Sequence, residues 1–327
     1  MKNHMSNSLK PGLTVIMPHY NHGEYVERAI NSHLWQTRPP ARIIIVDDKS
    51  SDTSVKVLKK LERDHSCIRL IERAINGGPN KAINTGLEFV ETEFVCLSGA
   101  DDFVSVEFSN IAISALESHP EAAFHFSDPS SYFQETECFL NIPLLLSEEA
   151  TCFTAYDFEA LFYHNHFSIP SNTAVYRTGK LLSAGGFWPN LHWNADWFTN
   201  LFLALDSGVC YTPGFRAHFQ INENSYGHQG VKSASSQREL LIHIIEILES
   251  RFPDIYTRFR RAALVPEMRL RTLRFLLGSK SGRRFLTTRL AIRLCAYEAW
   301  AWMRPWTPKG IRVSLRRIAA SFNQTNR

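Results

Sequence analysis

The chain has 327 residues, of which 44% are hydrophobic and 21% are charged, so it can bury a substantial core. It contains no run of about eighteen uninterrupted apolar residues, and residues 1–12 lack the hydrophobic stretch of a signal peptide. These features argue against a membrane-spanning or secreted protein. We expect a globular, cytosolic chain with a disordered segment at residues 1–12.

Charge is distributed unevenly along the sequence, although the net value is only +4. Residues 251–327 contain 18 Lys and Arg against 3 acids, a net +15, which leaves −11 for residues 1–250. This shift predicts a boundary between an acidic body and a basic extension, near residues 230–250. An acidic body would repel a long polyanion, so nucleic acid is not expected as a partner.

The six cysteines are scattered without CxxC spacing. Free thiols are the expected state for such cysteines in an intracellular protein. They are Cys67, Cys96, Cys138, Cys152, Cys210 and Cys295.

Short apolar runs alternate with segments of helical periodicity in the first third of the chain. Strands are expected at residues 13–17, 42–46, 68–71, 94–97 and 122–126, and helices at 24–35, 51–65, 80–90 and 105–118. Such alternation favours right-handed βαβ units and a mostly parallel sheet flanked by helices. Residues 128–169 indicate only a loop-rich segment with a helix near 155–163, whereas the tail beyond about residue 235 is predicted to be helical.

Two acidic doublets, Asp47-Asp48 and Asp101-Asp102, each follow a short apolar run. In open α/β sheets, ligands bind beyond the carboxyl ends of the strands, so both doublets are expected at one site. Paired carboxylates suit a hard divalent cation together with a phosphate ligand.

Further motifs accompany the doublets in a fixed order. They are Thr14-Val15-Ile16-Met17-Pro18-His19-Tyr20-Asn21, Gln36-Thr37, Ile45-Val46-Asp47-Asp48-Lys49-Ser50-Ser51-Asp52, Asn76-Gly77-Gly78, Asn84-Thr85-Gly86, Ala100-Asp101-Asp102, Gly185-Gly186-Phe187 and Ala195-Asp196-Trp197. Over roughly residues 13–220 this combination resembles the family 2 glycosyltransferases of the GT-A fold. The resemblance implies an inverting enzyme that uses a nucleoside diphosphate sugar. It also implies a GT-A domain at residues 13–230, with a nucleotide-sugar half (13–127) and an acceptor half (128–230), followed by a basic helical extension at 231–327.

The resemblance assigns the nucleotide-sugar site to residues of the first motifs. Asp48 would accept a hydrogen bond from the base, while Asp47 would shape the turn or reach the ribose. The alternative is that one of them only caps the turn at residues 50–52. The remaining candidates for nucleotide-sugar binding are Pro18, Tyr20, Asn21, Gly78, Lys81, Asn84 and Asp101. Lys81 replaces an arginine that is common nearby in the family, and the alternative is a solvated lysine.

Asp101 and Asp102 match the family's metal-binding motif, with Gly99 in place of its usual first acid. Mg²⁺ or Mn²⁺ would be held by these carboxylates and by substrate phosphates, and would neutralise charge on the leaving diphosphate. His218 is a further metal candidate, with an ordinary hydrogen-bonded histidine as the alternative. A solvated acidic loop or a helix cap is the alternative for the doublet.

Asp196 is the predicted catalytic base. Inversion by direct displacement needs one group to take the proton of the acceptor hydroxyl, and the family's base lies in an acidic motif after Gly185-Gly186-Phe187. Ala195 replaces the first acid of that motif. The neighbouring Trp193 and Trp197 should desolvate Asp196 and raise its pKa. A helix cap is the alternative role.

The sequence therefore predicts an inverting, metal-dependent transferase. Its donor would be a UDP-sugar, and its acceptor a saccharide or lipid-linked saccharide in cell-surface polysaccharide assembly. Basic residues and tryptophans in the tail favour peripheral contact with the inner face of the plasma membrane, or else a helical cap on the acidic body. The rival functions are a catalytically silent nucleotide-sugar binder and a sugar-phosphate nucleotidyltransferase. The latter is disfavoured because no Gly-rich Arg/Lys signature follows the first strand.

Overall fold

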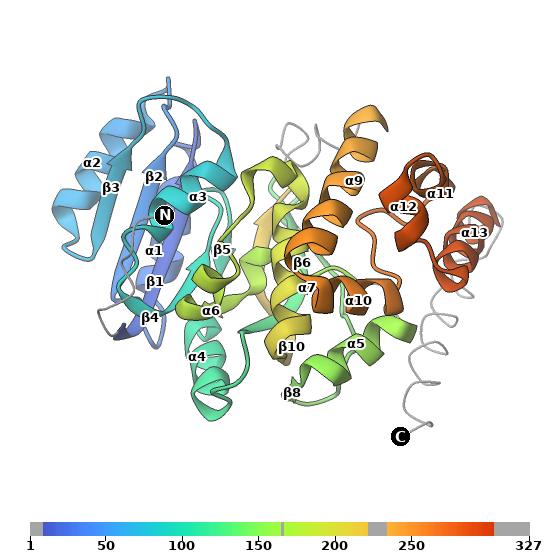
Figure 1. Ribbon diagram of the computed structural model, residues 1–327. Coiled ribbons are helices and arrows are strands. Elements are labelled where there is room, and N and C mark those ends of the chain that lie inside the picture. Colours follow the sequence, from blue (N-terminus) through green and yellow to red (C-terminus); the bar gives the residue numbers. More distant parts are fainter. Residues whose placement is uncertain (1–8, 165–166, 222–233, 304–327) are drawn as a thin grey trace. The chain divides into compact units, whose positions relative to one another are not determined.

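The computed structural model describes residues 9–164, 167–221 and 234–303 (Figure 1). The chain divides into two compact units. The first comprises residues 1–158 and 168–230, and the second comprises residues 159–167 and 231–327. The second unit therefore takes in a short segment from the middle of the chain as well as the basic extension.

The first unit is built on a ten-stranded sheet in the order β3-β2-β1-β4-β9-β6-β10-β5, with β7 paired to β6 and β8 paired to β10. The strands are β1 (Lys10–His19), β2 (Arg42–Asp47), β3 (Ile68–Glu72), β4 (Thr92–Leu97), β5 (Phe103–Val104), β6 (Phe124–Phe133), β7 (Cys138–Asn141), β8 (Thr151–Phe153), β9 (Val175–Arg177) and β10 (Val209–Gln220).

The N-terminal half of the sheet is wholly parallel, because β1 pairs with β2 and β4, and β2 pairs with β3, all in parallel. The connecting helices are α1 (Val26–Leu34), α2 (Ser54–Asp64) and α3 (Pro79–Leu87), and α4 (Phe108–Ser118) follows later. Each predicted strand and helix of this region is present within a few residues. One boundary differs, because β1 begins at Lys10, inside the segment expected to be disordered; residues 1–8 lie outside the described range.

Successive residues of β2 face opposite sides of the sheet, as strand geometry requires. Ile43 and Ile45 belong to the larger core cluster, which includes residues of α1, α2 and α4. Ile44 and Val46 pack with Ala82 of α3 on the other face. A strand covered on both faces is apolar throughout, which explains why the run before the first doublet has no polar alternation.

The second half of the sheet is mixed. β9 pairs antiparallel with β4 and β6, whereas β6 and β10 are parallel. The strand predicted at residues 122–126 corresponds to β6. The prediction ended it at residue 126, but β6 continues through buried polar residues. Asp128 shows why this is possible, since its carboxylate accepts hydrogen bonds from the Tyr211 hydroxyl (2.7 Å), Gly214 N (2.7 Å) and Leu144 N (2.8 Å).

Short elements complete the first unit. They are α6 (Thr178–Ser183), α7 (Ala195–Ser207) and two 3₁₀ turns, η1 (Ser171–Thr173) and η2 (Pro189–Asn194).

The expectation of free cysteines is wrong for one pair. Cys152 and Cys210 stand opposite each other in the antiparallel β8–β10 pair and form a disulfide, with their Cα atoms 4.0 Å apart. The two cysteines are 58 residues apart in sequence, so only strand pairing reveals their proximity. The other four cysteines are free.

The second unit is helical, as predicted. Its helices are α9 (Ala234–Arg251), α10 (Pro253–Arg261), α11 (Leu270–Leu277), α12 (Lys280–Phe285) and α13 (Thr288–Met303), while α5 (Ala155–His164) spans the division between the units. Among the described residues, no helix has both the length and the hydropathy needed to cross a bilayer.

Several arginines of this unit hold it together. Arg284 pairs with Glu249 at 2.5 Å, Arg271 pairs with Glu267 at 2.5 Å, and Arg293 donates to two backbone carbonyls. Part of the basic charge seen in the sequence is therefore structural.

Candidate active site

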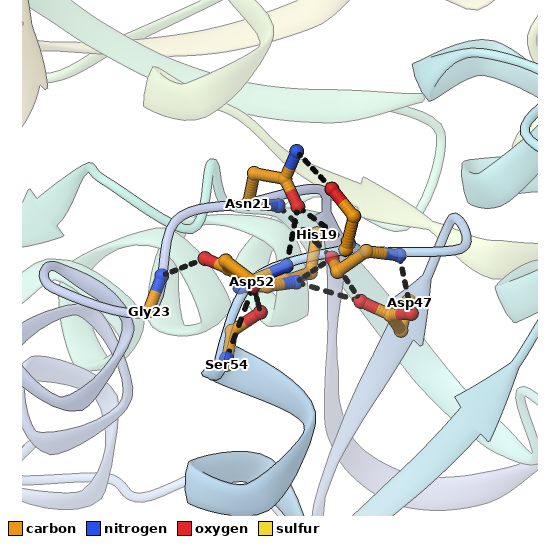
Figure 2. Close-up of polar contacts among 8 residues, drawn as sticks. His19, Asn21, Gly23, Asp47, Asp52 and Ser54 are labelled. Atoms are coloured by element: carbon orange, nitrogen blue, oxygen red, sulfur yellow. Dashed lines mark hydrogen bonds and ion pairs between the residues drawn. The ribbon is translucent and has the colours of Figure 1, made fainter.

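The first doublet ends β2 beside the end of β1, and Asp47 is tied into the turn (Figure 2). Its Oδ1 contacts His19 Nδ1 at 2.9 Å and accepts from Ser50 Oγ at 2.5 Å, while Oδ2 accepts from Ser50 N at 3.0 Å. Burial lowers the pKa of His19, and its contact with Asp47 opposes that effect. Of the two roles left open for Asp47, these contacts favour shaping the turn.

Asn21 fixes the loop that follows β2 (Figure 2). Its backbone has a left-handed φ of 55°, and its side-chain Oδ1 accepts from Ser51 N (2.8 Å) and Asp52 N (3.3 Å). Asp52 in turn accepts from Ser54 N at 3.0 Å, at the start of α2, and from Gly23 N at 3.5 Å. The two loops at the ends of β1 and β2 thus form one hydrogen-bonded rim, with Asn21 as a structural member.

Asp48 is 3% exposed and points away from that turn toward the start of α3. Its carboxylate accepts from Gly77 N (3.0 Å), Gly78 N (2.7 Å) and the Arg73 guanidinium. Gly78 has φ +83°, which favours glycine, and Lys81 is exposed in the first turn of the helix. Sequence reasoning missed Arg73, because its pairing with Asp48 depends on the parallel register of β2 and β3.

The second doublet lies just beyond β4 and is braced from two other elements. Asp102 Oδ1 accepts from Gln220 N at the end of β10 (3.1 Å), and Oδ2 accepts from Asn172 Nδ2 on η1 (3.3 Å). Asp101 lies 3.7 Å from His22 Nδ1. Burial, reinforced by the charge of Asp101, raises the pKa of Asp102 to about 7.

Gly99 leaves space that both carboxylates border. A Cβ at this position would lie 2.9 Å from Asp102 Oδ2 and 3.1 Å from Asp101 Oδ1. Two neighbouring carboxylates, one resisting ionisation, form a donor set whose chemistry fits a hard divalent cation. Among the described residues, no three His, Cys, Asp or Glu side chains form a metal cluster.

His218 is engaged in packing. Its Nδ1 contacts Ser130 Oγ at 2.9 Å, and its ring stacks on Phe103 (5.0 Å between centroids) and meets Phe139 edge-on (5.1 Å). Burial lowers its pKa. These contacts match the alternative of an ordinary hydrogen-bonded histidine.

A cavity of about 270 Å³ lies in the first unit and contains the predicted base. Its walls are formed by Pro18, Asn80, Ile83, Leu97, Ser98, Gly99, Ser171, Asn172, Phe187, His192, Trp193 and Asp196. Asp196 sits in the first turn of α7, where its Oδ1 accepts from Trp197 N at 2.7 Å. Burial raises the pKa of Asp196 to about 6, which confirms the predicted direction.

Three predicted binding residues differ in their relation to this cavity. Pro18 is part of its wall, whereas Tyr20 is exposed on the rim beyond β1. Asn84 lies behind the wall: its Oδ1 accepts from Phe187 N at 3.0 Å, and its Nδ2 donates to Phe187 O. Since both amide atoms are engaged, Asn84 positions Phe187. Gly186, at φ +69°, has no room for a Cβ, which would lie 2.8 Å from Asn84 Oδ1.

The cavity also includes residues that were not among the predicted donor-binding, metal or catalytic residues. Asn80 Nδ2 donates to His192 O at 2.6 Å, and His192 adopts φ 48° and ψ −124°, a conformation that is unfavourable for a side-chain-bearing residue. Asn172 links the cavity wall to Asp102. No motif marked these residues, because each is defined by a contact across the fold.

The family model described as Glycosyl transferase family 2 matches residues 14–179. The chain belongs to this family. The match spans the doublets, the rim and η1, so the family prediction made from the motifs is confirmed.

The relatives of this family 2 chain are matched over limited segments. It is 30% identical over 98 residues to the poly(ribitol-phosphate) beta-glucosyltransferase of Bacillus spizizenii, covering 29% of the present chain and 16% of the relative. Overall, the chain spans 16–38% of the length of the curated relatives that it matches.

Two solved structures confirm the GT-A-like fold of this family 2 chain. S. aureus TarS 1-349 in complex with UDP-GlcNAc aligns with a TM-score of 0.62 at 20% identity, over 77% of this chain and 70% of that one. Mannosyltransferase PcManGT from Pyrobaculum calidifontis, in complex with GDP-Man and Mn²⁺, aligns with a TM-score of 0.52 at 16% identity, over 90% and 88%.

Proposed function

We propose that the protein is an inverting glycosyltransferase that moves a sugar from a UDP-sugar to a hydroxyl of a saccharide or lipid-linked saccharide in cell-surface polysaccharide assembly. The observation that carries the proposal is Asp196, a carboxylate with a raised pKa in the wall of a cavity that also includes Gly99, next to the second doublet, and Asn172, which donates a hydrogen bond to Asp102. A base next to a diphosphate site is what direct displacement at a sugar carbon requires.

Residues at different places in the site have different proposed roles. Asp48, held by hydrogen bonds from the backbone amides of Gly77 and Gly78, would face the nucleoside, and Asp101 and Asp102 would hold Mg²⁺ or Mn²⁺. The cation, when bound, supplies charge neutralisation at the leaving diphosphate. Asp196 accepts the proton of the acceptor hydroxyl as that oxygen attacks the sugar carbon and the bond to the diphosphate breaks.

The relatives support a nucleotide-sugar donor, since TarS was solved with UDP-GlcNAc and PcManGT with GDP-Man. The choice of uridine rests on the resemblance and on TarS, and guanosine is the base to test against it. The Bacillus spizizenii relative is named a poly(ribitol-phosphate) beta-glucosyltransferase, which supports a polymer acceptor.

Replacement of Asp196 tests the proposal. With Mn²⁺, UDP-sugars and an acceptor pool, Asp196→Asn should lower UDP release at least about 100-fold, because a general base typically contributes 10²–10⁴-fold. UDP binding by calorimetry should change little. The matched control is Asp206→Asn, an exposed aspartate of the same helix, which should behave as wild type.

The same assay separates the rival functions. Wild-type protein that binds UDP-sugars but never releases UDP would be a silent binder. A nucleotidyltransferase would instead form a UDP-sugar from UTP and a sugar phosphate. Normal turnover by Asp196→Asn would remove this residue from the mechanism.

We also propose that the protein is cytoplasmic and contacts the inner face of the plasma membrane through its second unit. The support is the cationic composition of that unit together with exposed apolar side chains on α13, of which Ile292 is 63% exposed and Trp302 is 76% exposed.

A further inference from the structure

We infer that Arg28 of α1 is a positioning residue for the metal site: its guanidinium fixes the loop that carries Asp101 and Asp102 and thereby sets the affinity for Mg²⁺ or Mn²⁺. The inference rests on the proposed function, because it assigns a role toward the cation proposed for the second doublet. Arg28 belongs to none of the motifs that the sequence analysis singled out.

Arg28 binds the backbone of the doublet. Its Nη2 donates to the carbonyl oxygen of Asp101 at 2.7 Å, and the same nitrogen donates to Gln220 Oε1. The Asp101 carbonyl belongs to the planar peptide group that joins the two acids, so holding it restricts the directions in which both carboxylates leave the backbone. Within the same turn, Asp102 N donates to Gly99 O at 3.2 Å.

Arg28 also reaches the carboxylate of Asp102 through Gln220, which is buried at the end of β10. A guanidinium only donates, so the side-chain oxygen of Gln220 must face Arg28. Gln220 Nε2 then donates to Gln134 Oε1 at 2.8 Å, and Gln220 N donates to Asp102 Oδ1 at 3.1 Å. One arginine therefore acts on the two acids by separate routes, through the backbone of Asp101 and through the side chain of Asp102.

The guanidinium is itself held in place by aromatic rings. Its Cζ lies 4.7 Å from the centroid of the Phe103 ring on β5 and 5.5 Å from that of the Tyr132 ring on β6. Contacts between a cation and an aromatic ring are stabilising. Because β10 pairs with both β5 and β6, the two rings and Gln220 stand on neighbouring strands. Arg28 is thus anchored on the strands that brace the doublet.

The charge of Arg28 makes the inference testable by the sign of an effect. The guanidinium is half-buried, and the described residues give it neutral acceptors and aromatic rings. A positive charge near a cation site disfavours the cation, so charge alone predicts tighter Mn²⁺ binding when Arg28 is neutralised. Positioning predicts the opposite, because carboxylates that bind a metal are oriented by their hydrogen-bond partners.

Calorimetry with the full chain tests the inference. The affinity for UDP is measured with saturating Mn²⁺ and again with excess EDTA, and the ratio of the two affinities is the Mn²⁺-dependent gain. This gain is compared among wild type, Arg28→Met, Gln220→Ala and the double variant. Arg69→Met is the matched control, because Arg69 of β3 lies over the Phe89 ring at 4.1 Å, and β3 is at the opposite end of the sheet from β5.

Arg28→Met should lower the Mn²⁺-dependent gain at least about tenfold, while the affinity for UDP in EDTA should change little. Gln220→Ala should lower the gain about fivefold, the effect of losing one hydrogen bond. It keeps the backbone N–H that binds Asp102, and it provides an independent test if Arg28→Met does not fold. The double variant should lose less than the product of the two single losses, because both residues act through one network. Arg69→Met should match wild type.

Four results would overturn the inference. They are an unchanged or larger gain in Arg28→Met, an equal fall of its UDP affinity with and without Mn²⁺, single losses that simply multiply in the double variant, and an equal loss in Arg69→Met. Wild type whose affinity for UDP and for GDP gains nothing from Mn²⁺ would refute the proposed metal role and the inference with it. If wild type releases UDP with Mn²⁺ and any of the four results is found, the inference alone is refuted.

Discussion

At the scale of single residues, function depends on carboxylates whose surroundings differ. Asp47 and Asp48 are buried but accept several hydrogen bonds from nearby donors, whereas Asp196 is half-buried, accepts a hydrogen bond from Trp197 N, and has its pKa raised to about 6 by desolvation. A base that is ionised at neutral pH but still basic enough to take a hydroxyl proton fits this intermediate value.

The pKa of Asp196 predicts the pH dependence of turnover. Below about pH 6 the carboxyl is protonated and cannot accept a proton, so kcat should rise with pH through about 6 and then level off. The measurement is kcat at saturating Mn²⁺ and donor from pH 4.5 to 8. A profile that falls with increasing pH over this range would contradict the assignment of Asp196 as a base.

His33 predicts a pH effect on stability that is independent of activity. It is buried on α1, its ring nitrogens have no hydrogen-bond partner among the described residues, and desolvation lowers its pKa to about 4. The unfolded chain takes up a proton near pH 6.5 and the folded chain only near pH 4, so stability should fall as the pH drops through this window. The shift corresponds to about 3 kcal/mol of unfolding free energy.

His33→Leu should remove this loss, because leucine does not titrate. The measurement is the free energy of unfolding of both proteins in denaturant at pH 7.5 and pH 4.5. Between these pH values the wild type should lose more unfolding free energy than the variant. Parallel changes in the two proteins would show that His33 makes no such contribution.

At the scale of elements, the βαβ half of the sheet was predictable and the mixed half was not. Strands such as β2 are covered on both faces and therefore appear as unbroken apolar runs. β6 buries polar residues that are satisfied by hydrogen bonds from β10 and from a distant loop, so hydrophobic periodicity could not reveal its full length. The disulfide between β8 and β10 was also missed, because it joins cysteines that only strand pairing brings together.

The disulfide predicts a defined number of reactive thiols. When the protein is unfolded without reductant and alkylated, four of its six cysteines should react, and all six should react after reduction. Mass spectrometry counts the labels. Cys152→Ser should destabilise the oxidised protein by about 2–4 kcal/mol, because the bridge restricts the unfolded chain. Six labels without reductant would contradict the pairing.

At the scale of the whole molecule, the basic residues of the second unit fall into two groups: some form ion pairs, and others are exposed. Ion pairs such as Arg284–Glu249 account for part of the basic charge. Exposed cations remain on α11 and α12, including Arg274 and Lys280. These cations and the apolar side chains exposed on α13 are the groups that we propose meet anionic lipid.

Vesicle flotation tests this surface. The full chain should float with vesicles rich in phosphatidylglycerol and remain in solution with phosphatidylcholine alone. The double variant Ile292→Glu/Trp302→Glu should float several-fold less, because it places charge in the apolar surface. Trp35→Glu, which alters a tryptophan of the first unit that is 72% exposed, is the matched control. Absence of flotation for wild type, or equal loss in the control, would refute the membrane proposal.

The sequence by itself determined the family, the parallel half of the sheet and the position of the two doublets and Asp196 in the chain. These features are local, because apolar runs, helix periodicity and short motifs are written in neighbouring residues. Only the tertiary structure decided which side chains complete the site. Arg73 reaches Asp48 across β2 and β3, and Asn172 reaches Asp102 over 70 residues of chain. Such contacts depend on strand register and packing, which no local pattern encodes.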